Sequence, residues 1–127
     1  MKLIYQTLFE KGQGNCLSAA LASILEWELE DIPNFSLYKS WFYPELTKWL
    51  TSCNLGMIGL PNFPYNAYHL IKVKSPRIEG SFHELVGFSG KRIHDPHPQG
   101  NCEGELFQYD VLFPLNPSKP IIKPNGK

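Results

Sequence analysis

The segment from Cys16 to Trp27 constrains the fold most, because its pattern is helical and yet it has no polar face. Its apolar residues cover nearly the whole circumference of a helix: Leu17, Ala19, Ala20, Leu21, Ala22, Ile24 and Leu25. Asn15, directly before it, is a favourable N-cap residue. Small residues within the segment would let neighbouring elements approach closely. We therefore expect a buried central helix that the rest of the chain covers.

The remaining pattern predicts a helical region first and strands afterwards. Residues 36–53 carry an apolar stripe (Trp41, Leu46, Trp49, Leu50), and we expect a break at Pro44 with a second helix starting there. Strands are expected at 55–60, 68–73, 83–88, 91–94 and 106–113, and the segment 3–8 reads as a short strand or an extended arm. Ser89-Gly90 suits a hairpin turn. This order indicates an α+β fold with an antiparallel sheet, in a single domain over 1–127 that is irregular after about residue 114.

Composition narrows the function classes. The chain has 127 residues and a formal net charge of zero, so long-range charge favours neither nucleic acid nor an anionic membrane as a partner. No stretch approaches the roughly 20 apolar residues of a membrane span, and the N-terminus does not resemble a signal peptide. The three cysteines, an odd and sparse set, do not suggest a disulfide framework. We expect a cytoplasmic protein; the sequence leaves its oligomeric state open.

Cys16 is the first candidate for chemistry, since it follows Gly-Gln-Gly-Asn and opens the predicted buried helix. A thiol at a helix N-terminus experiences a partial positive charge and unpaired backbone N–H groups, and both stabilise the thiolate. The glycines before it leave space for a substrate backbone. The alternative is a small buried hydrophobic residue, because free cysteine is among the most buried residue types.

His83 and Asp95 form the second candidate group. Counting outward from the Ser89-Gly90 turn places His83 opposite the region of Asp95 and Pro96 in an antiparallel hairpin. An imidazole that acts as a base needs a neighbouring carboxylate or amide to fix its tautomer and stabilise its cation. The alternative is a surface histidine beside a turn-forming Asp-Pro pair.

Several stretches together resemble a group of small bacterial and bacteriophage proteins related to papain-like cysteine peptidases. They are Gln6-Thr7-Leu8-Phe9, the Gly-Asn-Cys helix start continuing to Leu25, Leu29 to Phe35, Ser75-Pro76-Arg77, His83-Glu84-Leu85-Val86-Gly87 and His94-Asp95-Pro96-His97-Pro98. The resemblance implies a papain-like fold with Cys16 as nucleophile, His83 as base and Asp95 as the residue that orients the base. It also implies an oxyanion-hole glutamine, for which Gln6 matches the pattern better than Gln13.

The same resemblance implies a reaction class. It is acyl transfer through a thioester, by which a peptide, isopeptide or side-chain amide bond is cleaved in a peptide or protein substrate. No cofactor and no metal are implied. Glu84 departs from the small apolar residue expected directly after the base, and the chain lacks room for the second lobe of classical papain enzymes.

Two other functions compete with this interpretation. His94 and His97, with Cys102 or Asp95, could bind zinc, although the proline-flanked spacing is awkward for two ligands on one ion. The second alternative is a catalytically inactive papain-like module for protein–protein interaction. Its contact surface would be the aromatic group Trp41, Phe42, Tyr43 and Trp49, whose ordinary role would be packing between helix and sheet.

Overall fold

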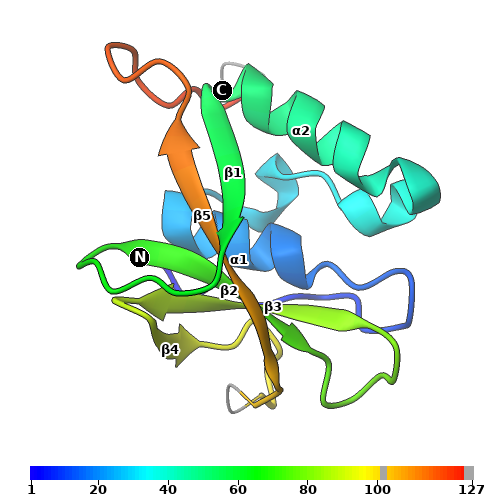
Figure 1. The fold of residues 1–127 in the computed structure, drawn as a ribbon. Helices are drawn as coiled ribbons and strands as arrows, with labels where there is room; N and C mark the ends of the chain where they lie inside the picture. Colours follow the sequence, from blue (N-terminus) through cyan, green and yellow to red (C-terminus); the bar gives the residue numbers. More distant parts are fainter. Residues whose placement is uncertain (101–102, 125–127) are drawn as a thin grey trace.

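An antiparallel sheet with two α-helices on it forms the protein (Figure 1). The computed structural model describes residues 1–100 and 103–124. Within them the elements are α1 (Cys16–Leu25), α2 (Phe42–Ser52), β1 (Leu55–Leu60), β2 (Tyr68–Lys74), β3 (Phe82–Phe88), β4 (Lys91–His94) and β5 (Leu106–Pro114). The five strands lie in the order β1-β5-β2-β3-β4, and every neighbouring pair is antiparallel. The predicted α+β class with an antiparallel sheet is confirmed.

Helix α1 is the buried centre that its composition predicts. Ala19 through Ala22 are fully buried, and the helix packs on β3 and β2. It ends two residues before the predicted Trp27, because Glu26 adopts a left-handed conformation with φ of 59° and closes the helix. The segment before α1 is an extended arm and not a strand. It lies along the helix, where the Ile4 N–H donates to the Ser23 hydroxyl.

The helical region after α1 differs from the prediction at its break. A 3₁₀ segment, Phe35–Trp41, contains Lys39 with φ of 56°, and α2 begins directly after it. The expected break at Pro44 is wrong, because Pro44 lies in the first turn of α2, where a missing N–H costs no helical hydrogen bond. As a result, the Trp41 side chain lies outside the apolar stripe and is 66% exposed.

The hairpin between β3 and β4 determines the position of Asp95, which follows β4. Ser89 and Gly90 both have positive φ (53° and 81°), as a tight hairpin turn requires. Gly87 pairs with Arg92, but Val86 pairs with His94, so Ile93 is an extra residue in β4. This bulge bends the strand and moves the register by one residue, and Asp95 follows directly after it.

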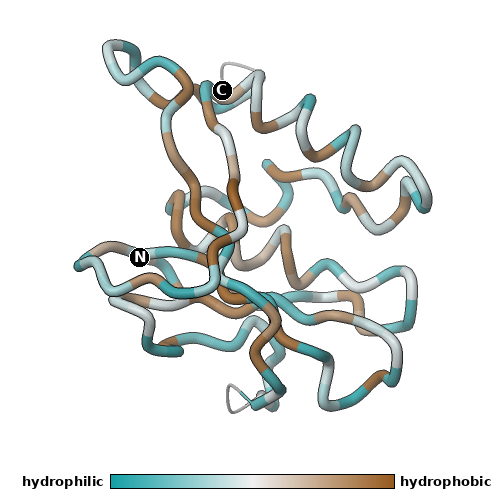
Figure 2. The backbone as a smooth tube through the Cα atoms, in the orientation of Figure 1, coloured by the Kyte–Doolittle hydropathy of each residue, from teal (hydrophilic) through white to brown (hydrophobic). Residues whose placement is uncertain are grey.

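Apolar side chains gather on both faces of the sheet. The larger cluster joins α1 and α2 to the sheet through Leu70 and Val86, and a smaller one contains Ile71, Val73 and Leu85. Figure 2 shows that α1, in the middle of the molecule, consists mainly of apolar residues. No described helix has the length and hydrophobicity that crossing a membrane would require. The chain after β5 is irregular, and the Ile122 N–H donates to the Cys53 carbonyl.

Candidate active site

Cys16 is the first residue of α1, and the arm in front of it determines its surroundings. The predicted N-cap, Asn15, makes no side-chain bond to the helix. Its Oδ1 instead accepts the N–H groups of Thr7 and Leu8, each at 3.0 Å. The expectation of a capping side chain is therefore wrong: Asn15 clamps the arm against the helix start. The first-turn N–H groups of α1 receive no bond from it.

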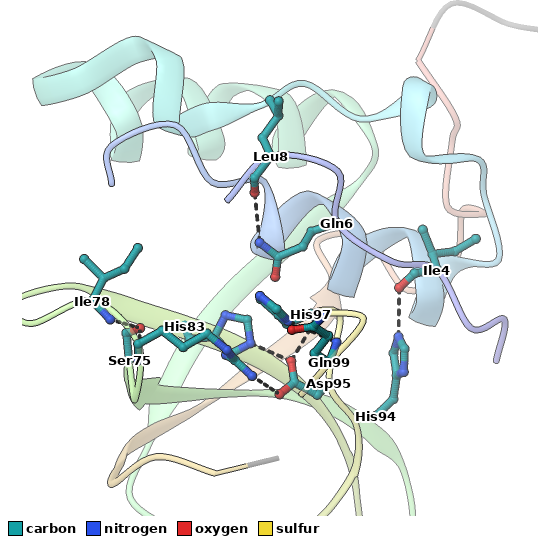
Figure 3. A network of polar contacts seen from close by, with 11 residues as sticks. Ile4, Gln6, Leu8, Ser75, Ile78, His83, His94, Asp95, His97 and Gln99 are labelled. Carbon is teal, nitrogen blue, oxygen red and sulfur yellow. Dashed lines mark hydrogen bonds and ion pairs between the residues drawn. The ribbon is translucent and has the colours of Figure 1, made fainter. Parts of the chain in front are cut away.

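His83 and Asp95 are held together within the protein. His83 Nε2 lies 2.6 Å from Asp95 Oδ1, and the two side chains are only 7% and 3% exposed. The same carboxylate oxygen accepts the backbone N–H of His97 at 2.9 Å, so the turn after β4 fixes its direction (Figure 3). Cys16 lies beside the His83 ring, and both residues line the same cavity.

The electrostatics of the group favour a charged imidazole. Burial alone would lower the pKa of His83, but the hydrogen bond to Asp95 and the neighbouring Cys16 thiol outweigh it and raise the pKa from 6.5 to about 9. At neutral pH His83 is therefore an imidazolium between a carboxylate and a thiol. Such a cation stabilises a thiolate and later supplies a proton.

Gln6, and not Gln13, belongs to this group. The Gln6 side chain is buried and lines the same cavity as Cys16 and His83, whereas Gln13 is exposed and does not. Gln6 Nε2 donates to the Leu8 carbonyl at 2.9 Å, and Oε1 accepts no hydrogen bond from a described residue. The Gln6 backbone N–H also donates to the Pro96 carbonyl, which ties the arm to the turn after Asp95.

The cavity in front of Cys16 has a volume of about 480 Å³, a size that suits a ligand or a substrate side chain. The arm, the start of α1, the start of α2 and the turn between β2 and β3 enclose it. Its apolar lining consists of Phe9, Leu17, Phe42, Leu46, Met57, Ile78 and Phe82. The cavity therefore provides an apolar surface beside the thiol for contact with a ligand, and a few polar groups that could orient the ligand.

The two other candidate histidines have structural partners. His94 Nε2 bonds to the Ile4 carbonyl at 2.8 Å, so this ring anchors the arm. His97 Nδ1 accepts the Gln99 N–H at 3.1 Å. Among residues 1–100 and 103–124, no group of three or more His, Cys, Asp or Glu side chains is placed to hold a metal ion. Cys102, the other proposed zinc ligand, lies outside the described residues.

We expect purified protein to contain no stoichiometric zinc, because the His94 ring is already bonded to a carbonyl and Asp95 to His83. Chelation should leave the free energy of unfolding unchanged, whereas structural zinc contributes directly to folding. Elemental analysis and denaturant titration with and without chelator test this. One equivalent of zinc per chain would refute it.

A buried ionic group beside the cavity was missed by sequence reasoning. Glu84 is buried, and burial and then the charge of Asp110 raise its pKa well above the ordinary 4.5. Lys72 Nζ lies 4.0 Å from Asp110 Oδ2 and donates to the Tyr43 hydroxyl at 3.0 Å. Glu84 had only one signal, its unusual position directly after His83; Asp110 had none, because strand pairing brings it near.

Gly100 provides a test of how tightly Asp95 is held. A Cβ at this position would overlap the Asp95 carboxylate, so the glycine permits a close approach. We expect Gly100→Ala to push the carboxylate away from His83 and to slow iodoacetamide alkylation of Cys16 at pH 7 by about fivefold, a loss on the order of 1 kcal/mol. Gln99→Ala, in the same turn, is the control, since the Gln99 side chain is exposed and does not line the cavity. Equal rates in the two variants would contradict the expectation.

Comparisons with protein-family models, curated proteins and solved structures find no match to this chain.

Proposed function

We propose that this protein is a thiol hydrolase or acyl transferase with a papain-like fold, which cleaves a peptide, isopeptide or side-chain amide bond. One observation carries the proposal: His83 is bonded to Asp95 through Nε2 at 2.6 Å and lies beside the Cys16 thiol in the lining of one cavity. A nucleophile, a base and an orienting carboxylate in this sequence are what acyl transfer requires. The papain-like fold rests on the resemblance and on the chain order of helix-start cysteine, strand histidine and aspartate.

The proposed reaction has two half-reactions. The Cys16 thiolate attacks the substrate carbonyl carbon, and the carbonyl electron pair moves to its oxygen. The N–H groups at the start of α1 and Gln6 Nε2, which lies in the same cavity, are the proposed donors for that oxyanion. The imidazolium of His83 then gives its proton to the leaving amine, and a thioester on Cys16 results. In the second half-reaction His83 takes a proton from water, or from an acceptor amine, which attacks the thioester and releases Cys16.

A second function is an inactive papain-like module that binds another protein. Two aromatic side chains favour it, since Trp41 is 66% and Tyr43 58% exposed at the start of α2. The other two members of the suggested contact surface are less available. Phe42 and Trp49 pack against the core cluster. The exposed area is therefore smaller than the sequence indicated, and we rank this function second.

Reactivity of the thiols separates the two functions. An uncharged alkylating reagent that reacts with thiolates should label Cys16 much faster than Cys53, because burial raises the pKa of Cys53 to about 11. Cys53 therefore serves as an internal control within each molecule. Peptide and amide libraries, with Cys16→Ala as the inactive control, would then identify the bond that is cleaved. A Cys16 that reacts no faster than a free cysteine in solution would support the binding module.

A further inference from the structure

Two basic side chains meet at the rim of the cavity, on the side of the β2–β3 turn. Arg77 lies on this turn and lines the cavity. Lys11 reaches the turn from the N-terminal arm: its Nζ lies 3.9 Å from where a Cβ on Gly80 would be, and it lines the cavity too. Segments far apart in the sequence thus place two cations at one edge of the space in front of Cys16.

The Arg77 guanidinium uses little of its hydrogen-bonding capacity. Its one ion pair with a described residue is to Asp95 Oδ2, at 3.7 Å, which is longer than a hydrogen bond. A guanidinium carries five N–H donors in a planar fork. The side chain is 32% exposed, so it is partly withdrawn from water and yet reachable from the cavity.

The backbone under Arg77 is fixed, which keeps its side chain at the rim. The Ser75 hydroxyl accepts the N–H groups of Arg77 and Ile78, at 3.2 and 3.0 Å. The Ser75 N–H donates to the Ser81 carbonyl and closes the turn. A cation on a fixed turn loses less conformational freedom when it binds a ligand than one on a loose loop.

The acidic residues nearby do not pair with these cations. Glu10 and Glu79 belong to the same two segments, but neither forms an ion pair within 4.0 Å with a described residue. Glu84 also lines the cavity, but it forms no ion pair within 4.0 Å with a described residue, and burial raises its pKa well above the ordinary value. Lys72, the third cation of the lining, is already bonded to Tyr43. The donors that remain are those of Arg77 and Lys11.

We propose that Arg77, assisted by Lys11, binds a carboxylate of the substrate, so that the enzyme acts on acidic peptides. A planar guanidinium fork matches a carboxylate in a bidentate arrangement, and Lys11 adds a point charge. The inference rests on the proposed acyl-transfer function for its substrate. Anion binding at Arg77 can be tested without a cleaved substrate, because the positive charge would attract any anion that approaches Cys16.

Paired alkylating reagents test the site without a substrate. Iodoacetate and iodoacetamide both alkylate a thiolate with loss of iodide. Iodoacetate carries a carboxylate, whereas iodoacetamide carries a neutral amide in its place. The measured quantity is the ratio of their rates at Cys16, followed by mass spectrometry at pH 7. We expect Arg77→Gln to lower the iodoacetate-to-iodoacetamide ratio about five- to tenfold, the range of a charge-assisted hydrogen bond. Arg77→Lys keeps the charge but loses the planar fork, and it should give a ratio between those of the wild-type protein and Arg77→Gln.

The controls separate charge from position. Lys11→Gln should lower the ratio about twofold, as an exposed charge contributes less. Lys48→Gln removes an exposed lysine of α2 that does not line the cavity and should leave the ratio unchanged. The His83 cation contributes to the ratio in every variant, so the change between variants reports Arg77. If Arg77→Gln slows both reagents equally, Arg77 acts only through Asp95 and the anion site is refuted.

The outcome for the anion site is distinguishable from that for the enzyme. A Cys16 that reacts no faster than an ordinary thiol would contradict the proposed function, whatever the ratio is. A reactive Cys16 with an unchanged ratio in Arg77→Gln would contradict only the carboxylate site. For a cleaved peptide, changing its glutamate to glutamine should lower kcat/KM in the wild-type protein and should have little effect in Arg77→Gln.

Discussion

Replacing His83 with alanine should slow the alkylation of Cys16 by iodoacetamide at pH 7 about 30-fold, because a thiol with the free pKa of about 8.5 is only a few per cent thiolate there. Its imidazolium is the cation that contacts the thiol in the wild-type protein. The helix N-terminus stays in place and contributes only on the order of 1 kcal/mol. The measurement is the alkylation rate of Cys16 from pH 5 to pH 10 in both proteins.

Two further substitutions make the assignment specific. Asp95→Asn should give an intermediate rate, since the ring keeps a partner at Nε2 but loses the charge that stabilises its cation. His97→Ala should have little effect, because the His97 ring accepts only the Gln99 N–H in the turn. If His97→Ala slows alkylation more than His83→Ala does, the base has been misidentified, and the role of Asp95 is refuted with it.

The pH dependence of turnover follows from the same ring. The pKa of His83 is raised to about 9, so the imidazolium is present at neutral pH and disappears as the pH rises through about 9. The leaving amine needs that proton, and turnover should therefore fall on the alkaline side near pH 9. Steady-state kcat/KM across pH 6 to 10 measures this. An alkaline limb near the ordinary histidine pKa of about 6.5 would show that His83 is not held in its charged form.

Phe35→Ala should lower the free energy of unfolding by roughly 3–5 kcal/mol, the range for truncating a buried aromatic ring. Phe35 is 1% exposed, and its ring meets the edges of Phe42 and Trp49 with centroids 6.2 and 5.8 Å away. It joins the 3₁₀ segment to α2 and to the core cluster. Urea titration monitored by circular dichroism gives the difference between the two proteins.

Trp41→Ala is the matched control for this prediction. Trp41 lies in the same 3₁₀ segment but is 66% exposed, so its truncation should change stability by no more than about 0.5 kcal/mol. A cost for Trp41→Ala similar to that for Phe35→Ala would contradict the packing described above. It would indicate that Trp41 is covered in solution.

The sequence predicted best those elements that one local pattern of residues is enough to define. An apolar segment without a polar face defines α1, and the strands were placed to within about one residue. The break before α2 was misplaced because Pro44 is compatible with a first helical turn, whereas the actual break at Lys39 depends on a backbone angle that lysine rarely adopts. Nothing in the residue type signals that angle.

For the candidate site, the residue types were predictable and their partners were not. Cys16, His83 and Asp95 stood out by position at a helix start, in a strand and after a strand. The function of Asn15 as a clamp on the arm depends on a segment with no regular structure. The bulge at Ile93 depends on the register of the β3–β4 hairpin, which the turn residues do not specify. The approach of Asp110 to Glu84 depends on the pairing of strands that are distant in sequence. Arg77 reaches Asp95 through a turn whose path no periodicity describes.

The chain order of the site affects when its chemistry can begin during synthesis. Cys16 leaves the ribosome before His83 and Asp95, which follow it by 67 and 79 residues. Their pairing also requires β3 and β4 to have formed a hairpin. On the proposed function, a nascent chain that has not yet formed this hairpin carries Cys16 without its base. The activity would then begin only when most of the sheet is assembled, and neighbouring proteins would not meet the activated thiol while the chain is still unfolded.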